Sequence, residues 1–219
     1  MIIAIDGPAG VGKSTVAKLL ASRLKFLYLD TGALYRAVAR AVLQHNIDPA
    51  DAAAVAALLP GLSLQMQFKN ETVIVRLNEK DITNELRTPV VSAAASVVSA
   101  IPAVRAWLLP VQRRIGQEGS VVAEGRDIGT TVFPGAEVKF FLEADATVRA
   151  ERRHRELVAA GHSRGIEQTS AEIAGRDKRD RSRAVAPLVA APDAHHIDTS
   201  RVSTTEVVER MMAVIAAKL

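Results

Sequence analysis

The sequence lacks features that several classes of protein require. It has no cysteine, so disulfide bonds and thiolate metal sites are excluded, and this composition suits a reducing compartment. No apolar run approaches the roughly 20 residues that a helix needs to span a bilayer, and the stretch Met1–Asp6 contains no basic leader. We therefore expect a soluble, cytoplasmic protein. The absence of repeats, coiled-coil heptads and low-complexity linkers favours a single domain over residues 1–219.

The formal net charge of +4 is concentrated in one segment. Residues 149–183 contain nine arginines and one lysine against six acids, which alone accounts for the positive excess. Arginine outnumbers lysine 20 to 8 in the whole chain, and a planar guanidinium binds phosphate in a bidentate manner that an ammonium cannot reproduce. The bias indicates phosphate ligands, although an ion-paired, solvated helix face has the same composition.

Short apolar segments alternate with longer helical stretches. The apolar segments are typical of strands buried on both faces of a parallel sheet: Ile2–Ile5, Phe26–Leu29, Val121–Ala123, Val138–Leu142 and His195–Ile197. Helices are expected over Ser14–Leu24, Ala33–His45 and Ala103–Gln117, with Asp48–Pro49 starting another and Ser203–Glu206 forming a capping box. The alternation predicts an α/β fold with a doubly wound, five-stranded parallel sheet.

Two stretches interrupt this alternation. Leu62–Thr83 reads as a small β-rich insertion, because two strand-like runs flank Lys69–Glu71 as in a hairpin. The arginine-rich segment Arg149–Arg183 reads as two charged helices with a break at 160–165, which suggests a helical lid. Both are expected to be insertions into one domain.

A glycine-rich motif lies between the first expected strand and the first expected helix. It fits G-x-x-x-x-G-K-[ST], whose backbone N–H groups surround phosphate oxygens at the positive end of a helix. Lys13 is expected to reach the β- and γ-phosphates of ATP, and the Ser14 hydroxyl to be a ligand of Mg²⁺. The alternative is a glycine-rich turn that binds nothing. The candidate nucleotide-binding residues here are Gly7, Pro8, Ala9, Gly10, Val11, Gly12, Lys13, Ser14 and Thr15.

The remaining motifs concern the group that accepts the phosphoryl. No Asn-Lys-x-Asp guanine signature occurs and the chain is short for a motor, which leaves a small-molecule kinase. The segment Asp30–Arg36 opens a helix at a strand end, where parallel sheets place ligands. Its residues are expected to bind substrate, unless Asp30 or Thr31 serves only as a helix cap.

A second polar cluster follows the third expected strand. Glu124 resembles an acid that orients Mg²⁺, Arg126 is suited to hold a phosphate, and Asp127 to accept hydrogen bonds from an amino group. A local ion pair between Arg126 and Asp127 is the alternative. No catalytic base is required, because a phosphate acceptor brings an anionic oxygen, so arginines must position the two phosphates and neutralise their charge.

Taken together, these segments resemble the bacterial cytidylate kinases, within the nucleoside monophosphate kinase group of P-loop kinases. The resemblance rests on GPAGVGKS at 7–14, LDTGALYR at 29–36, AEGRDIGT at 123–130, VFPGAEVKFFL at 132–142 and RDKRDRSRAVAPL at 176–188. It covers nearly the whole chain. By this resemblance, the β-rich stretch belongs to an NMP-binding insertion at about 60–95, and the lid extends over about 149–183.

The resemblance also implies roles for individual residues. Ser96, Arg105 and Asp127 are expected to bind the cytosine, and Arg36, Arg126 and Arg183 the CMP phosphate. Arg176 and Asp180 are expected to face the sugar, and Arg149, Arg152 and Arg153 to close over ATP. Thr31, where many members have serine, is expected near the monophosphate, and Tyr35 belongs to the same substrate-binding set. The catalytic set is Lys13, Arg126, Arg152 and Arg183, and the metal set is Ser14 and Glu124.

The sequence thus leads to the hypothesis of an ATP- and Mg²⁺-dependent kinase of CMP or dCMP. Such an enzyme is expected to be a monomer that binds neither nucleic acid nor membrane. Two rivals remain open. One is a kinase with another acceptor, such as UMP or a small metabolite, which Asp127 disfavours because its carboxylate suits the amino group of cytosine better than a uracil carbonyl. The other is an RNA-binding or regulatory P-loop protein whose basic segment grips a nucleic-acid backbone.

Overall fold

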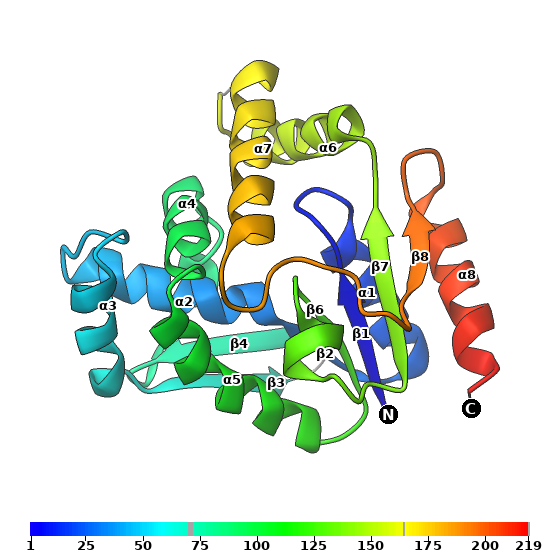
Figure 1. The fold of residues 1–219 in the computed structure, drawn as a ribbon, viewed down its shortest axis with the longest axis horizontal. Coiled ribbons are helices and arrows are strands. Elements are labelled where there is room, and N and C mark those ends of the chain that lie inside the picture. Colours follow the sequence, from blue (N-terminus) through cyan, green and yellow to red (C-terminus); the bar gives the residue numbers. More distant parts are fainter. Residues whose placement is uncertain (70–71, 164, 219) are drawn as a thin grey trace.

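The core of the molecule is the predicted parallel sheet. The computed structural model describes residues 1–69, 72–163 and 165–218. Its five-stranded sheet has the order β2-β6-β1-β7-β8, and every neighbouring pair is parallel (Figure 1). The strands are β1 (Ile2–Asp6), β2 (Leu27–Asp30), β6 (Val121–Glu124), β7 (Val138–Glu143) and β8 (His195–Asp198). All five predicted strands are therefore confirmed.

Helices cover both faces of this sheet, as a doubly wound fold requires. On one face, Ile3 and Ile5 share a hydrophobic core with α1 (Lys13–Leu24) and α8 (Thr204–Ala216). On the other, Ala4 belongs to a core that includes α2 (Thr31–Gln44), α4 (Pro89–Val98) and α5 (Pro102–Gln117). Successive residues of β1 thus point to opposite cores, which explains why its sequence is continuously apolar.

A smaller, antiparallel sheet occupies the first insertion. The strands β3 (Leu64–Lys69), β4 (Thr72–Leu77) and β5 (Lys80–Asp81) form it, with α3 (Ala52–Leu58) preceding them. The expected hairpin turn includes residues 70 and 71, which lie outside the described residues. Short 3₁₀ turns at Leu59–Gly61 and Thr83–Glu85, and a π-turn at Ile128–Val132, complete the secondary structure of the described ranges.

The arginine-rich segment forms two helices that project beyond the carboxyl edge of the sheet (Figure 1). These are α6 (Ala146–Ala159) and α7 (Ile166–Ser182), and they separate where the break was expected, with residue 164 outside the described residues. Helix α7 also contacts α4 across the top of the molecule. Within the described ranges no single helix is long and apolar enough to cross a membrane, although α4 and α5, bent by 102°, reach that length and apolarity together.

The helix-start predictions had different outcomes. The capping box at Ser203 is confirmed, because its hydroxyl accepts from the Glu206 N–H and the Glu206 carboxylate accepts from the Ser203 N–H. The expectation that Asp48–Pro49 starts a helix was wrong. The carboxylate of Asp48 accepts from the Ala50 N–H in a turn, and α3 begins later, with Asp51 as its cap. Both aspartates are good caps, and sequence pattern alone does not distinguish them.

Candidate functional site

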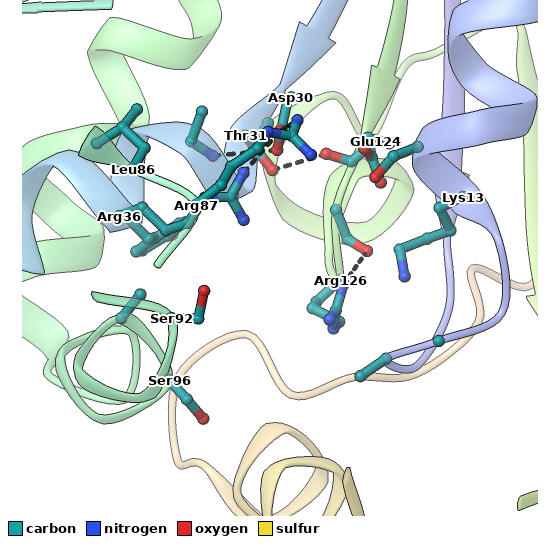
Figure 2. Close-up of a pocket in the computed structure, with 18 of the residues that line it drawn as sticks. Lys13, Asp30, Thr31, Arg36, Leu86, Arg87, Ser92, Ser96, Glu124 and Arg126 are labelled. Carbon is teal, nitrogen blue, oxygen red and sulfur yellow. Dashed lines mark hydrogen bonds and ion pairs between the residues drawn. The ribbon is translucent and has the colours of Figure 1, made fainter. Parts of the chain in front are cut away.

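Polar groups converge at the carboxyl edge of the parallel sheet. Each of its five strands ends on an acid, namely Asp6, Asp30, Glu124, Glu143 and Asp198. Above this edge lies a cleft of about 1640 Å³, lined by the glycine-rich loop and by residues of α2, α4, α5 and α7. A single small ligand usually occupies about 300–1,000 Å³, so the cleft has room for two. Figure 2 shows Lys13 and Arg126 projecting into the same open part of it.

Three glycines give the loop its shape. Gly7, Gly10 and Gly12 all have positive φ angles, of 147°, 78° and 91°, which side chains rarely tolerate. A Cβ atom on Gly7 would lie 2.3 Å from the carbonyl oxygen of Leu142, and one on Gly10 would lie 2.9 Å from that of Arg149. The backbone at Gly7 and Gly10 is therefore pressed against its surroundings, with no room for a side chain.

Replacing Gly7 with alanine is expected to lower the free energy of unfolding by about 1–3 kcal/mol, since the new methyl group meets a β7 carbonyl and φ is unfavourable. Urea denaturation measures this change. The matched control is Gly135→Ala, because no described atom lies within 4 Å of the place its new methyl group would take, and a shift within about 0.5 kcal/mol is expected there. Equal losses at the two positions would contradict the assignment of crowding to Gly7.

Lys13 is buried at the base of the cleft. Its Nζ donates to the carbonyl oxygen of Pro8 at 2.7 Å, and the residue is 5% exposed. Burial, and then the positive charge of Arg126, lower the pKa of Lys13 well below its usual value. An anion placed between Lys13 and Arg126 would relieve this repulsion, so the geometry suits a phosphate.

Asp6 was not among the predicted site residues, yet it joins the loop to the π-turn. Its two carboxylate oxygens accept from the N–H groups of Ile128 and Gly129, each at 2.8 Å. Burial raises the pKa of Asp6 to about 6, although those two N–H groups act in the opposite direction. The signal in the sequence was its place as the last residue of β1, immediately before the glycine-rich motif.

This elevated pKa predicts a pH dependence of stability. Between pH 4 and 6 the folded protein holds a proton on Asp6 that the unfolded chain releases, so raising the pH through this window weakens the folded state. Relative to Asp6→Asn, which cannot titrate, the wild-type free energy of unfolding should increase by about 2 kcal/mol from pH 7 to pH 4. Chemical denaturation of both proteins at each pH measures the difference. Parallel pH profiles would contradict it.

Glu124 lies beneath the loop, where its carboxylate is buried and accepts a hydrogen bond from the Tyr28 hydroxyl at 2.7 Å. Tyr28 also interacts with the hydroxyl of Ser14, which places the two predicted metal ligands around one tyrosine. The proximity of carboxylate and hydroxyl oxygens suits Mg²⁺, which prefers oxygen ligands and retains several waters. No cluster of three or more His, Asp or Glu side chains arranged to hold a metal occurs among the described residues. Tyr28 was missed, because its role depends on the pairing of β2 with β6.

Asp30 is the helix cap considered from the sequence, and it also pairs with Arg36. Its carboxylate caps α2 by accepting from the Ala33 N–H at 3.0 Å, and it binds Arg36 at 2.6 Å. Burial acts to raise the pKa of Asp30, but Arg36, Arg87 and the cap together hold it below its usual value. Arg87, a residue the sequence did not single out, lies 3.4 Å from the same carboxylate (Figure 2). The hydroxyl of Thr31 donates to the Glu124 carbonyl oxygen at 2.7 Å.

Arg126 and Asp127, although neighbours in the chain, do not pair with each other. Asp127 binds Arg105 through one oxygen and Arg183, at 3.2 Å, through the other. Arg126 instead binds Asp180 of α7, with Nε 2.9 Å from the carboxylate. The local ion pair considered from the sequence is therefore absent, and both acids join residues far apart in the chain. The guanidinium of Arg105 lies over the ring of Tyr35, with its Cζ atom 5.4 Å from the ring centre.

The cleft holds more positive charge than its acids balance. Arg176 faces it from α7, and the structure records no hydrogen bond or ion pair for this side chain with any described residue. Removal of its guanidinium from solvent, and then the charge on Arg126, lower the pKa of Arg176 to about 10. Arg36 and Arg153 add to this repulsion. Several arginines forced together in this way form an anion-binding site.

The three arginines at the start of the arginine-rich segment occupy different places. Arg149 lies beneath the loop, bound to Asp177 and to the Ala9 carbonyl oxygen at 3.0 Å. Arg153 lines the large cleft and pairs with Glu156 at 3.0 Å. Arg152 does not reach that cleft. It lines a smaller cavity of about 330 Å³ on the other side of the loop, where Thr199 holds its guanidinium at 2.6 Å and 3.0 Å.

Ser96 lies on α4 at the opposite side of the cleft from the loop (Figure 2). It is 4% exposed, and its hydroxyl oxygen accepts hydrogen bonds from Arg179 of α7. Thr15 is exposed in the first turn of α1 and lines both cavities. The structure thus brings most of the predicted residues to the two cavities, which lie on either side of the glycine-rich loop, whereas Gly7, Pro8 and Arg149 line neither.

Comparison with known proteins gives one consistent family. The family model described as cytidylate kinase matches residues 3–217. A cytidylate kinase from Carboxydothermus hydrogenoformans is 47% identical over 218 residues, which cover 100% of this chain and 98% of the relative. One from Geobacillus sp. is 45% identical, covering 99% and 97%. An uncharacterized protein from Eubacterium ventriosum shares the fold, with a TM-score of 0.56 at 16% identity over 99% and 98% of the two chains.

Proposed function

Because the chain belongs to the cytidylate kinase family, we propose that it transfers the γ-phosphoryl group of ATP to CMP or dCMP, giving CDP or dCDP and ADP. The observation that carries the proposal is the shared cleft, which is lined by a buried lysine, an acid beneath the phosphate loop and Arg176, for which no partner is recorded among the described residues. A kinase acting on a phosphate needs this arrangement, because two anionic groups must be brought into contact.

The donor side suits Mg-ATP. The loop from Gly7 to Thr15 would hold the phosphates through backbone N–H groups, and Lys13 would contact the β- and γ-phosphates. Ser14 and Glu124 would hold Mg²⁺ directly or through water, and the ion would neutralise phosphate charge. Arg153 would contact ATP directly, Arg152 would contact it from the smaller cavity, and Arg149 would act by fixing the loop. These roles are consistent with the positive φ angles and the crowding of the loop glycines.

The acceptor side suits a cytidine monophosphate. Asp127, whose carboxylate is oriented by two arginines, would accept from the amino group of cytosine, while Ser96 and Arg105 contact the same ring. Arg36, Arg126 and Arg183 would hold the phosphate next to Thr31, and Arg176 and Asp180 would face the sugar. Tyr35 would support Arg105 from below. We place the NMP-binding segment at about 60–95 and the lid at about 149–183.

In the proposed mechanism the chain supplies no base. The acceptor phosphate carries its own nucleophilic oxygen, which Arg126 would hold in line with the γ-phosphoryl group that Lys13 contacts. As the bond to the β-phosphate oxygen breaks and the new phosphorus–oxygen bond forms, these cations and Arg183 stabilise the charge on the transferred group. Helices α6 and α7 would exclude water that would otherwise hydrolyse ATP.

An ADP-release assay with Mg-ATP and a panel of CMP, dCMP, UMP, AMP, GMP and no acceptor tests the proposal. Turnover confined to CMP and dCMP is expected. Turnover with UMP alone would favour the rival kinase, and acceptor-independent hydrolysis would overturn the kinase assignment. We further propose a cytoplasmic monomer that binds neither membrane nor nucleic acid. RNA binding that weakens steeply with salt would contradict the last of these.

A further inference from the structure

A contact between α7 and α4 crosses the cleft beside the candidate base-binding residues. Two N–H groups of Arg179 donate to the same atom, the hydroxyl oxygen of Ser96, from Nε at 3.2 Å and Nη2 at 3.1 Å. Arg179 lies near the end of α7, and Ser96 lies in α4. Neither the sequence motifs nor the proposed mechanism gives Arg179 a role.

This contact determines which hydrogen bonds Ser96 can still make. A hydroxyl has one donor and two acceptor lone pairs, and Arg179 uses both lone pairs. In the described part of the chain, no acceptor is recorded for the Ser96 proton, not even a carbonyl of the preceding helical turn, where a serine often donates. Ser96 is 4% exposed and lines the cleft. The Ser96 proton is therefore left without a recorded acceptor in the described residues, beside the cleft that Ser96 lines.

Ser96 is connected to the acid that faces the same base. The Ser99 hydroxyl donates to the Ser96 carbonyl oxygen at 3.1 Å, Arg105 donates to the Ser99 carbonyl oxygen at 3.2 Å, and Arg105 also binds Asp127. The Asp127 carboxylate accepts hydrogen bonds from Arg105 and Arg183. In the proposed site the base thus meets Asp127 as an acceptor and the Ser96 hydroxyl, with Arg105, as donors, all joined by a buried network.

We infer that Arg179 is a specificity-determining residue, which acts by fixing the Ser96 hydroxyl as a donor so that the site accepts cytosine and rejects uracil. The inference rests on the proposed function. Cytosine offers an amino donor next to a ring-nitrogen acceptor, whereas uracil offers a carbonyl next to an N–H donor. A free hydroxyl could rotate to accept from that N–H, but one whose lone pairs are occupied cannot. Arg179 therefore opposes uracil as well as supporting cytosine.

Local structure leaves Arg179 free for this task. Gly175, one turn earlier in α7, has no side chain, and a Cβ there would lie 3.7 Å from the third guanidinium nitrogen of Arg179. That distance is ordinary van der Waals contact, so the α7 backbone leaves the Arg179 guanidinium room to lie along this turn and reach Ser96. Arg179 itself is exposed, so its replacement should leave the fold intact.

The test compares Arg179→Met with wild type in kcat/KM for CMP and for UMP, with competitive inhibition by UMP as a second measure of uracil binding. The ratio of CMP to UMP should fall about tenfold, the effect of about one hydrogen bond. Arg179→Lys retains the charge without the paired N–H groups, so its ratio should lie between those of the wild type and Arg179→Met. The control is Arg181→Met on the same helix, which is exposed and makes no recorded contact among the described residues; it should leave the ratio unchanged.

A second background separates a positioning role from a structural one. In the Ser96→Ala background, adding Arg179→Met should change the ratio of kcat/KM for CMP to that for UMP less than twofold. The Ser96 hydroxyl oxygen, through which Arg179 acts, is absent from that background. An unchanged ratio in the single variant would overturn the inference, and so would an equal fall in both backgrounds. If the wild-type enzyme does not phosphorylate CMP at all, the proposed function fails instead, which the same assay reveals before any variant is made.

Discussion

Replacing Lys13 with methionine should lower kcat by about 100- to 1,000-fold while leaving the protein folded. Lys13 has a single recorded hydrogen bond, to Pro8, and its Nζ projects into the cleft beside Arg126 (Figure 2). The proposed mechanism uses this charge on phosphate oxygens, where loss of one preorganised donor typically costs this factor. Methionine matches the shape of the side chain without its charge, so the packing beneath the loop is retained.

Steady-state kinetics with saturating Mg-ATP and CMP measures the effect, and thermal unfolding shows whether the fold survives. Because burial already lowers the pKa of Lys13, removing the amine should change the free energy of unfolding by no more than about 1 kcal/mol. Lys178→Met is the control, since Lys178 is exposed and lines neither cavity, and its kcat should match the wild type. A Lys13 variant that kept more than a tenth of wild-type kcat would contradict the proposed role.

Asp127→Asn should produce the largest loss of stability, about 3–5 kcal/mol. The Asp127 carboxylate is 4% exposed and holds Arg105 and Arg183, which are 6% and 8% exposed. Without its charge, two guanidinium groups remain buried with insufficient compensation, and breaking a buried pair costs about this much. Denaturant unfolding measures the change, and kcat/KM for CMP should fall together with it.

The control for this prediction is Asp193→Asn. It breaks the ion pair with Lys139, in which the side chain of Asp193 is 63% exposed and that of Lys139 9% exposed. Lys139 keeps its hydrogen bond to the Pro134 carbonyl oxygen, so a loss of only about 1 kcal/mol is expected. Adding Arg105→Gln to Asp127→Asn should recover part of the loss, because one uncompensated charge is then removed. If the Asp127 variant lost no more stability than the Asp193 variant, the buried cluster would not be a stabilising element of the fold.

Local features made most of the fold predictable from sequence. The β1 strand is buried on both faces and is therefore continuously apolar, and the loop after it needs glycines at positive φ angles. Ser203 and Glu206 form their capping box within four residues. In each case the residues that determine the structure are neighbours in the chain, so their pattern can be read directly.

The parts of the site that sequence reasoning missed depend on distant partners. Tyr28 and Glu124 meet only because β2 lies beside β6, and Arg126 pairs with Asp180, 54 positions later, rather than with its neighbour. Arg179 looks like any other arginine in a charged helix until α7 is placed against α4. No local pattern carries this information, because these side chains would fit the same helix or strand equally well if the fold gave them other partners.

The anchoring of Ala9 determines how the two arginine-rich helices can move. Arg149, near the start of α6, donates to the Ala9 carbonyl oxygen, and Asp177, near the end of α7, accepts from the Ala9 N–H at 3.2 Å. The two side chains also bind each other, so both helices are fastened to the backbone of one residue, Ala9. If α6 and α7 move together, as proposed for the lid, we expect the loop between them to be displaced more than their ends at Arg149 and Asp177, which are tied to the phosphate loop.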